Sequence, residues 1–493
     1  MIRSVRQRIS DTGSAVPDQP ALVGFDADLA EQALSWRELA GLVETGAGIV
    51  RAELAGRDRP CVVVPAGNTL AAATGIATAL AAEVPVFPMN PATPPAERDI
   101  LLGLLGQRFS HVYLMAEDHR PHRVDQPAGS APAGAGAVGY LLATGGSTGI
   151  PRISARPGPI RYDPARTPSM VIRQTGWRTG QRQLIVGPLY HAAPFTAFLD
   201  ALLDSNTVVL QPLFSPQWTV ELVRRYAVEW MQLTPTHMRE ILRLARPDPE
   251  SFAGLRAMLH TAARCDPDTK RGWIDLLGPH RVYELYGATE GIGVTLVRGD
   301  EWLARPGTVG RGFLTQIRVL DGAGRPVAPG TSGTVYLRTP HRIGRSDYVD
   351  DRSIRTTPDG FATVGDRGRL DRDGYLFLEP RDHDTINVGG EKVDPNEVEA
   401  ALLDHPGVLD AVAMAVPHQT LGSVVGAQVV LRPETTLRKA ELAAHCGRRL
   451  AGYKIPKQFT FVDRIPRSAA GKLQRWRLDP NHEGGAPRDE PSR

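Results

Sequence analysis

Two long parts of the chain alternate helix-like and strand-like segments, and this alternation constrains the fold more than any other feature. Within residues 1–110, the segment SWRELAGLVETGAGIVRAEL, residues 35–54, places apolar side chains at helical spacing, whereas PCVVVPAG, residues 60–67, is typical of a short buried strand. The same alternation returns over residues 181–295. Helices and strands that alternate in this way cover the faces of a sheet with helices, so we predict a layered α/β fold.

The later part of the chain departs from this pattern. Over residues 306–380 the helical periodicity disappears and short strand-like runs replace it, which predicts a β-rich subdomain. At 493 residues the chain also exceeds the size at which a single core keeps growing. We therefore expect a large N-terminal domain, residues 1–380, a small mobile α+β domain, residues 381–480, and a disordered polar tail, residues 481–493.

Local signals support a separate small domain. Asp394, Pro395 and Glu397 are typical of an N-cap, a first-turn proline and a capping-box glutamate, so a helix should begin there. The segments LDAVAMAVP and VGAQVVLR should follow as strands. After them we expect an amphipathic helix, with one buried face. That face carries Leu442, Cys446 and Leu450.

The composition excludes several classes of protein. The 57 basic and 54 acidic residues nearly balance and are scattered, so neither nucleic acid nor a charged membrane surface is expected as a partner. The longest apolar stretch, Thr69 to Pro88, is interrupted by Glu83, and we interpret it as a buried helix and strand rather than a membrane span. The N-terminus lacks the apolar core of a signal peptide and the three cysteines are far apart, which favours a reducing cytoplasm.

The segment YLLATGGSTGIPRIS, residues 140–154, collects the most flexible residues of the chain behind a strand-like run. Glycine allows close backbone approach, and serine and threonine add hydroxyl donors, so such a loop can wrap a phosphate. The spacing does not match the pattern GxxxxGK[ST] of nucleoside triphosphatases. Taken alone, the segment fits a phosphate loop and a plain turn equally well.

Four further segments accompany this loop: YGATEG (286–291), VGDRGRLDRDGY (364–375), PRDHDTINVGGEKVDPNEVE (380–399) and PRSAAGKLQR (466–475). Together with TGGSTGIPR they resemble, in sequence and in order, the signature motifs of adenylate-forming enzymes, the superfamily of acyl-CoA synthetases, peptide-synthetase adenylation domains and firefly luciferase. The resemblance spans nearly the whole chain. It implies that a carboxylate attacks the α-phosphorus of ATP to give acyl-AMP and pyrophosphate, after which a thiol displaces AMP.

The resemblance also implies a nucleotide site. Arg152 stands where the family usually has lysine, and its planar guanidinium changes the phosphate contacts without removing the charge. Glu290 is expected to hold Mg²⁺, because a hard cation takes oxygen ligands. Tyr286 is expected to face adenine beside the turn TAAR, and Asp366 to accept the ribose hydroxyls. The other expected ligands of ATP or coenzyme A are Thr144, Gly145, Gly146, Ser147, Thr148, Gly149, Ala262, Ala263, Glu284, Gly287, Thr289, Arg381, Gly389, Gly390 and Lys392.

Lys472 is the residue that the resemblance makes most important for catalysis, together with Thr144, Glu290 and His191. Its ammonium would neutralise the charge that grows between the attacking carboxylate and the α-phosphate, an effect typically worth ~3 kcal/mol or more. In the family the small C-terminal domain rotates between the two half-reactions. His383 occupies the hinge position, which is usually Asp or Lys, and the Gly-Gly segment then lines the pantetheine tunnel.

The acid itself is predicted from the acyl side of the same resemblance. Amino-acid-activating relatives carry an aspartate after the P-L-aromatic strand, whereas this chain has PLYHAAPFTAF, with His191 and no acidic residue. An acid without an α-amine is therefore expected, with its carboxylate near His191. The expected acyl-pocket residues are His191, Ala192, Ala193, Ala262 and Gly287. Because most of them are small, and because LHTAARC resembles CoA ligases for steroid, bile or terpenoid acids, we predict a hydrophobic, polycyclic carboxylic acid.

Three alternatives stay open at this point. The enzyme could be specialised for one half-reaction, given Arg152 and His383, or it could deliver the acyl group to a carrier protein instead of coenzyme A. A non-catalytic nucleotide-binding module is the alternative from another class, and the joint presence of Lys472, Glu290 and Asp366 argues against it. A homodimer is neither predicted nor excluded.

Overall fold

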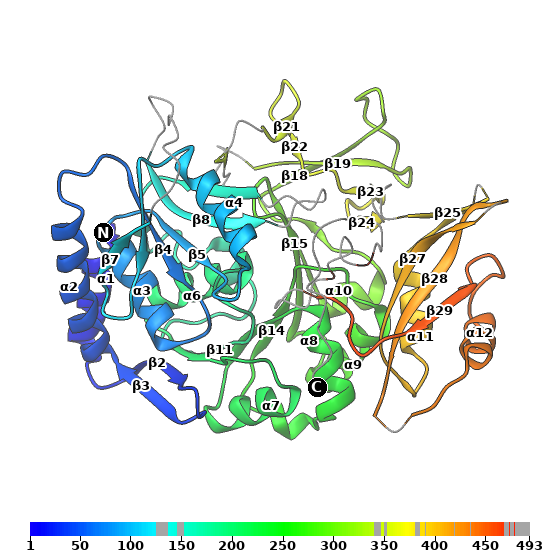
Figure 1. The fold of residues 1–493 in the computed structure, drawn as a ribbon, viewed down its shortest axis with the longest axis horizontal. Helices are drawn as coiled ribbons and strands as arrows, with labels where there is room; N and C mark the ends of the chain where they lie inside the picture. Colours follow the sequence, from blue (N-terminus) through cyan, green and yellow to red (C-terminus); the bar gives the residue numbers. More distant parts are fainter. Residues whose placement is uncertain are drawn as a thin grey trace, which may run out of the picture. The chain divides into compact units, whose positions relative to one another are not determined.

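The structure is a computed structural model, and it describes residues 1–124, 137–144, 152–339, 347–349, 353–379, 385–389, 391–418, 420–433, 435–467, 473 and 478. The chain divides into two compact units, Met1–Leu378 and Glu379–Arg493 (Figure 1). The buried clusters of apolar side chains lie within one unit or the other, so each unit has cores of its own.

The largest sheet of the first unit has the strand order β17-β16-β15-β14-β13-β11-β12-β2-β3. The six strands from β15 to β2 run parallel, and antiparallel strands extend both edges. Because parallel strands point the same way, the loops after their carboxyl ends meet at one edge of the sheet. The strands are β2 Pro20–Phe25, β3 Glu31–Ser35, β11 Arg182–Ile185, β12 Thr207–Leu210, β13 Trp230–Leu233, β14 Ala257–His260, β15 Val282–Gly287, β16 Val294–Arg298 and β17 Arg311–Gly312.

A second sheet of the first unit has the order β20-β9-β8-β5-β4-β6-β7, with the four strands from β8 to β6 parallel. The strands are β4 Pro60–Pro65, β5 Val86–Met89, β6 His111–Met115, β7 Pro121–Arg123, β8 Val138–Thr144, β9 Arg152–Pro157 and β20 Asp347–Tyr348. The stretch from Thr69 to Pro88 forms a buried helix and then β5, as predicted. The glycine-rich loop follows the carboxyl end of β8.

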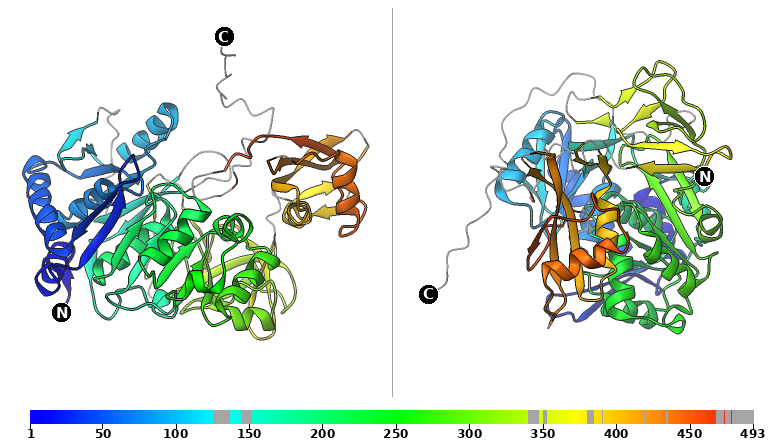
Figure 2. Two further views of the ribbon diagram at one scale, coloured as in Figure 1. Left: turned by 90° about the horizontal axis from the view of Figure 1, so that it is seen from below. Right: turned by 90° about the vertical axis from the view of Figure 1, so that its right-hand side faces the viewer.

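Helices separate and cover these two sheets. Four helices pack between them and share one apolar core with both: α1 Val5–Ala15, α2 Trp36–Glu53, α3 Leu70–Ala81 and α6 Ala192–Leu203. Capping boxes at Ser4 and Ser35 begin α1 and α2. The outer face of the seven-stranded sheet is covered by α4 Pro95–Gly106. The outer face of the nine-stranded sheet is covered by α7 Pro216–Arg225, α8 Pro235–Glu240 with its extension Ile241–Ala245, the turn Pro249–Phe252, and α9 Pro267–Leu277. Figure 2 shows these layers from two further directions.

A β-rich part follows in the same unit, as the loss of helical periodicity predicted. Its six-stranded sheet has the order β21-β22-β19-β23-β24, with β18 beside β19. The strands are β18 Gln316–Leu320, β19 Gly333–Arg338, β21 Arg355–Thr356, β22 Ala362–Thr363, β23 Arg367–Leu370 and β24 Leu376–Glu379. The remaining elements of the first unit are β1 Arg3–Ser4, β10 Arg161–Tyr162, α5 Met170–Arg173 and α10 Gly299–Ala304.

The second unit packs two helices on one face of a five-stranded sheet. Its elements are β25 Ile386–Val388, β26 Glu391–Val393, α11 Pro395–Leu403, β27 Val408–His418, β28 Gly422–Leu431, α12 Lys439–Gly447 and β29 Gln458–Phe461. Asp394 caps α11 as predicted, but the expected capping box is wrong. The Glu397 carboxylate instead accepts hydrogen bonds from Lys454 Nζ at 2.7 and 2.8 Å, because a full charge competes better for it than a backbone amide.

The predicted fold class is confirmed: a large α/β part with a β-rich region is followed by a small α+β part. Leu442, Cys446 and Leu450 all enter the core of the second unit, although α12 ends before Leu450. Within the described residues, no helix combines the length and the apolar character that crossing a membrane requires.

Candidate active site

Of the predicted site residues that the structure describes in the first unit, most lie at the carboxyl edge of the nine-stranded sheet. His191 is the N-cap residue of α6, which follows β11, and Ala192 and Ala193 open that helix. Ala262 and Ala263 follow β14, while Gly287 ends β15 and is followed by Thr289 and Glu290. Strands β11, β13, β14 and β15 are neighbours in the sheet. The topology therefore brings together segments that are about a hundred positions apart in the sequence.

Ala262 has an unusual backbone conformation. Its φ angle is 80°, in the left-handed region that L-residues with a Cβ atom disfavour. Its side chain and that of Ala263 are exposed. A small residue is therefore tolerated at this turn at some cost in strain, and glycine would fit it better.

The glycine-rich loop begins at a different sheet. Thr144, the last residue of β8, pairs with Arg152, the first residue of β9. Gly145, Gly146, Ser147, Thr148 and Gly149 lie outside the described residues. The Nε atom of Arg152 is buried and has no hydrogen-bond partner among the residues that the structure describes. A buried guanidinium donor in this position suits an anion.

Glu290 is buried and hydrogen-bonded to a tyrosine that sequence reasoning missed. The Tyr348 hydroxyl donates to Glu290 Oε1 at 2.5 Å. Burial, and then the hydrogen bond to Glu290, raise the pKa of Tyr348 to about 12, so the phenol keeps its proton and acts as a donor. Glu290 retains a second carboxylate oxygen, which is a suitable ligand for a hard cation.

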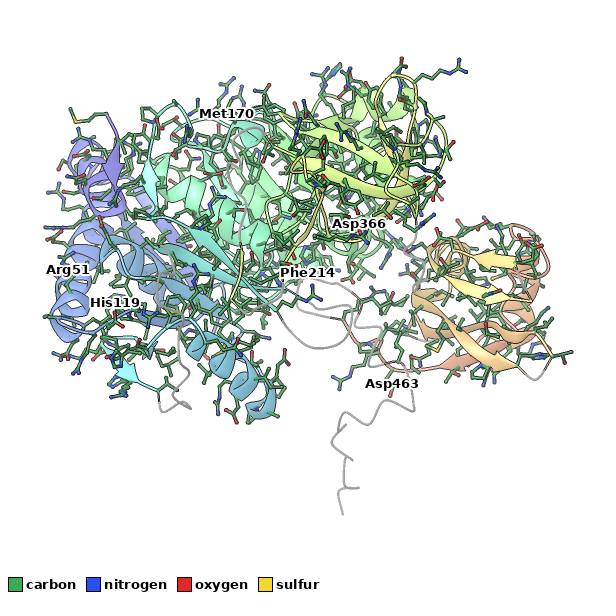
Figure 3. All side chains as sticks on the ribbon, turned by 90° about the horizontal axis from the view of Figure 1, so that it is seen from above. Arg51, His119, Met170, Phe214, Asp366 and Asp463 are labelled. Carbon is green, nitrogen blue, oxygen red and sulfur yellow. The ribbon has the colours of Figure 1, made fainter. Side chains whose placement is uncertain are left out.

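Tyr286 and Asp366 are joined directly. The Tyr286 hydroxyl donates to Asp366 Oδ2 at 2.7 Å, which connects β15 to the turn before β23. The two residues are 80 positions apart in the sequence and belong to different predicted motifs, so these two motifs are in contact in the structure. Asp366 and Phe214, which follows β12, are labelled in Figure 3.

A buried group of charged and polar side chains lies beneath β15. Lys270 on α9 forms an ion pair with Glu284, and both side chains are nearly inaccessible to solvent, at 1% and 7% exposure. The Lys270 ammonium also lies 5.0 Å from the centroid of the Trp302 ring. His260 stands opposite Glu284 in the sheet, and neither of its ring nitrogens has a hydrogen-bond partner within the described part of the chain. Burial and the charge of Lys270 hold the pKa of His260 well below its ordinary value, so its ring is neutral.

Aromatic and imidazole rings gather on the side of the sheet edge that carries His191. The His191 ring lies 4.6 Å from that of Tyr190. His237, on the first turn of α8, packs against Phe214, with 4.4 Å between the centroids of the two rings. Burial, and then the charge of His191, lower the pKa of His237 to about 4. The His237 ring is therefore uncharged at neutral pH, and it lies on the same side of the site as the small side chains that open α6.

The predicted residues of the second unit are described only in part. Gly389 has φ = 59°, a conformation that favours glycine, and a Cβ atom there would displace the end of the Leu421 side chain, whose Cδ2 would lie 2.9 Å away. Lys392 lies on β26, opposite Asn387. Four predicted residues lie outside the described part of the chain: Arg381, His383, Gly390 and Lys472.

Three residues of the site were not found by sequence reasoning: Tyr348, Lys270 and His237. Tyr348 lies outside the five motifs, and Lys270 and His237 lie within helical segments whose periodicity gave no reason to single them out. Among the described residues, no three His, Cys, Asp or Glu side chains cluster closely enough to hold a metal ion on their own. A metal ion at Glu290 therefore needs further ligands, such as phosphate oxygens or water.

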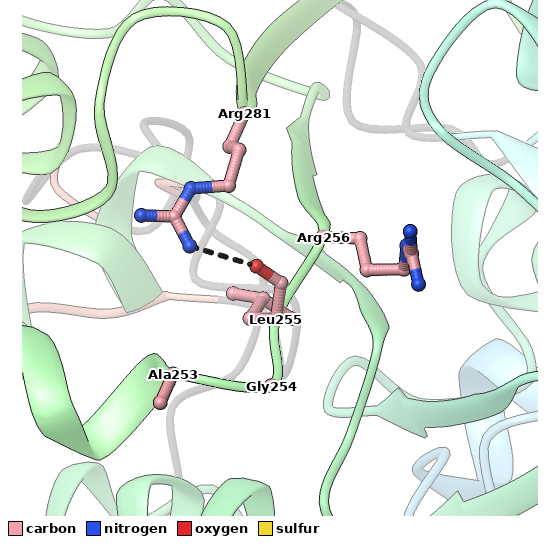
Figure 4. A pocket seen from close by; sticks show the side chains of 5 residues that line it. All are labelled: Ala253, Gly254, Leu255, Arg256 and Arg281. Carbon is pink, nitrogen blue, oxygen red and sulfur yellow. Dashed lines mark hydrogen bonds between the residues drawn. The ribbon is translucent and has the colours of Figure 1, made fainter.

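A separate surface pocket of about 510 Å³ contains none of the predicted residues. It is lined by Ala253, Gly254, Leu255, Arg256 and Arg281 (Figure 4). Arg281 donates to the Leu255 carbonyl at 3.1 Å. The pocket lies where β14 and β15 begin, which is the opposite end of these strands from the candidate site.

Comparison with known proteins places this geometry in a family. The family described as AMP-binding enzyme matches residues 10–344, and the AMP-binding enzyme C-terminal domain matches residues 397–472. The chain is 32% identical to a sulfoacetate–CoA ligase from Cupriavidus necator over 69% of this chain and 67% of that protein. It is 30% identical to the fatty acid–[acyl-carrier-protein] ligase ScoC from Streptomyces coeruleorubidus, over 80% of this chain and 75% of that protein.

A third relative is the 3-oxocholest-4-en-26-oate–CoA ligase from Rhodococcus rhodochrous, which is 29% identical over 71% of this chain and 67% of that protein. Among solved structures, ATP-bound MatB from Rhodopseudomonas palustris superimposes with a TM-score of 0.77 at 23% identity, covering 97% of this chain and 98% of that one. At this level of identity the structural similarity establishes the fold.

Proposed function

This chain belongs to the AMP-binding enzyme family, and on that basis we propose that it activates a hydrophobic, polycyclic carboxylic acid as its coenzyme A thioester. The coarser activity is that of an AMP-forming acyl-CoA ligase, which uses ATP, Mg²⁺ and coenzyme A. The acid's carboxylate attacks the α-phosphorus of ATP and pyrophosphate leaves. The thiol of coenzyme A then attacks the acyl carbon and AMP leaves.

The residues of the first unit suit this nucleotide. The observation that carries the proposal is that the motif at residues 286–291 contacts other predicted segments at two points: Tyr286 bonds to Asp366, and Glu290 bonds to Tyr348, whose ring lies beside Arg152. In the proposed roles, Arg152 donates to the β- and γ-phosphates, Asp366 accepts from the ribose, and the Tyr286 hydroxyl holds Asp366 in place. Glu290 would bind Mg²⁺, which supplies positive charge to the phosphates when bound.

Lys472 is proposed to stabilise the charge that develops during adenylation, with Thr144 and the glycine-rich loop on the phosphates. We expect Lys472→Ala to slow pyrophosphate release by a factor of about 10² or more, which corresponds to about 2.7 kcal/mol. It should still convert supplied acyl-AMP to the thioester. Single-turnover measurement of each half-reaction tests this, and equal loss of both steps would contradict the proposed role.

The proposed acid follows from the small side chains on the acyl side. Ala192 and Ala193 open α6 next to His191, and the neutral ring of His237 belongs to the same side, so small side chains leave room for a bulky acid. One relative acts on a steroid-derived acid, and others act on small acids such as sulfoacetate. The size of the acid is therefore the quantity to test.

A panel of fatty, aromatic and polycyclic acids, with AMP and acyl-CoA measured separately, tests the substrate class. Ala192→Leu should exclude bulky acids by overpacking and spare short ones. Loss of activity that is uniform across the panel would indicate damage to the fold or to the nucleotide site. Preference of the wild-type enzyme for short, polar acids would contradict the proposal.

A carrier-protein thiol is the second candidate acceptor. It is favoured by the relative that transfers fatty acids to an acyl carrier protein and that matches 80% of this chain. Both acceptors can present a thiol to the same acyl-AMP. Comparing acyl-AMP consumption with coenzyme A and with a phosphopantetheinylated carrier protein decides between them.

A further inference from the structure

Tyr348 contacts two of the proposed site residues at once. It lies on β20, where it stands opposite Ser154 of β9 in the seven-stranded sheet. Its hydroxyl donates to Glu290 Oε1 at 2.5 Å, and the guanidinium carbon of Arg152 lies 5.3 Å from the centroid of its ring. One side chain therefore connects a carboxylate in the turn between β15 and β16 of the nine-stranded sheet to a cation that begins β9 of the seven-stranded sheet.

Arg152 and Glu290 do not neutralise each other in this arrangement. Among the ion pairs of the described residues none joins them, and Arg152 Nε is buried without a hydrogen-bond partner, while the rest of the guanidinium interacts with the Tyr348 hydroxyl. Both side chains contact Tyr348, Glu290 is buried and Arg152 is half-buried, and opposite charges in such a site attract, so an intervening group is needed to keep them apart. A direct ion pair would occupy the carboxylate oxygens that a metal ion needs and the guanidinium donors that a phosphate needs.

We propose that Tyr348 is a positioning residue that keeps the Arg152 guanidinium and the Glu290 carboxylate apart. Arg152 is then free to bind the phosphates of ATP, and Glu290 is free to bind Mg²⁺. A phenol suits this task, because its hydroxyl occupies one carboxylate oxygen while its ring face attracts the guanidinium. The inference rests on the proposed function, since it concerns the same nucleotide site.

Tyr348→Phe tests the proposal, because phenylalanine keeps the ring beside Arg152 and removes the hydroxyl, which donates to Glu290 and also interacts with the Arg152 guanidinium. At saturating ATP, we expect the apparent affinity for Mg²⁺ to fall at least tenfold, which corresponds to about 1.4 kcal/mol. The affinity for ATP without Mg²⁺ should change by less than about twofold, a difference of about 0.4 kcal/mol. The measurement is the thermal shift that added Mg²⁺ gives to the ATP-bound protein, so it does not depend on turnover.

Tyr375 provides a matched control. It is buried like Tyr348, its hydroxyl donates to Glu301 Oε1 at 3.1 Å, and its ring centroid lies 4.3 Å from the guanidinium carbon of Arg305. Tyr375→Phe thus removes the same kind of hydrogen bond from the same kind of cluster, on a different carboxylate. We expect it to leave the Mg²⁺ affinity unchanged.

A double-mutant cycle with Glu290→Gln shows whether Tyr348 acts through Glu290. Once the carboxylate is gone, adding Tyr348→Phe should change the Mg²⁺ affinity by less than about twofold. An unchanged Mg²⁺ affinity in Tyr348→Phe alone, or an equal loss with and without Glu290, would overturn the proposal. If wild-type protein with ATP shows no shift on adding Mg²⁺, the proposed function itself fails.

Arg152→Gln tests whether the guanidinium and the Glu290 carboxylate are kept apart, without any change at Tyr348. This variant provides the test if Tyr348→Phe does not fold. If the two charges are held apart, removing Arg152 should weaken ATP binding and leave the Mg²⁺ affinity of the ATP complex unchanged. Tighter Mg²⁺ binding in Arg152→Gln would show that the guanidinium competes for Glu290 in the wild-type protein, and would overturn the proposal.

Discussion

The buried ion pair between Lys270 and Glu284 makes a sharp prediction about stability. Both side chains are almost fully buried, and the Lys270 ammonium has the Trp302 ring as its other neighbour at 5.0 Å. Lys270→Met keeps most of the volume of the side chain and removes its charge. The Glu284 carboxylate is then left in the interior without its cation.

The expected cost is about 3–5 kcal/mol, the range for removing one partner of a buried ion pair. Of this, about 0.5–2 kcal/mol belongs to the lost contact between the ammonium and the Trp302 ring. Adding Glu284→Gln removes the unpaired charge but not the lost ring contact. The double variant should therefore recover at least about 2 kcal/mol and stay slightly less stable than wild type.

Urea unfolding followed by tryptophan fluorescence measures these differences. Every tryptophan except Trp476 lies in the first unit, so the signal reports that unit. The control is Arg6→Met, which breaks an equally charged but exposed pair with Glu44, at 47% and 51% exposure, and should change the stability far less than Lys270→Met. A loss below about 1 kcal/mol for Lys270→Met, or no recovery on adding Glu284→Gln, would refute the reasoning.

Three further predictions concern strain, acid stability and the hinge. Ala262→Gly should raise the free energy of unfolding by about 1 kcal/mol, because alanine is strained at φ = 80° and glycine is not; urea unfolding measures this, and a loss would contradict it. The pKa of His237 is about 4 in the folded protein and about 6.5 unfolded, so its neutral ring stabilises the fold above pH 6.5 and that contribution, roughly 3 kcal/mol, is lost as pH falls towards 4. His237→Gln keeps a capping-box residue at that position and should remove this part of the stability that is lost at acidic pH. An unchanged dependence of the unfolding free energy on pH would show that His237 is not its source. His383→Pro, at the hinge position that the family resemblance implies, should retain pyrophosphate release and abolish thioester formation, because proline fixes φ near −65°; equal slowing of both steps in single-turnover assays would place the rotation elsewhere.

The sequence alone determined the layers of the fold, because the periodicity of apolar residues is a local property. The segments at residues 35–54 and 60–67 became α2 and β4, and the loss of helical periodicity after residue 306 became a sheet without helices in the described residues. The order of the five motifs determined the family, which the comparisons confirmed. It also indicated the glycine-rich loop and Glu290 as site residues, and these roles stay predictions.

Only the tertiary structure decided which side chains form hydrogen bonds and ion pairs with one another. Tyr348 and Glu290 are 58 positions apart in the sequence and share a hydrogen bond. Glu397 bonds to Lys454, 57 positions away, instead of to the backbone at the start of its own helix. Lys270 meets Glu284 because α9 packs against β15, although helical spacing gave no reason to choose that lysine. A local pattern states which face of an element is buried. It does not state which strand becomes its neighbour, and charges and hydrogen bonds in the interior depend on that choice, since their energy falls off within a few ångströms.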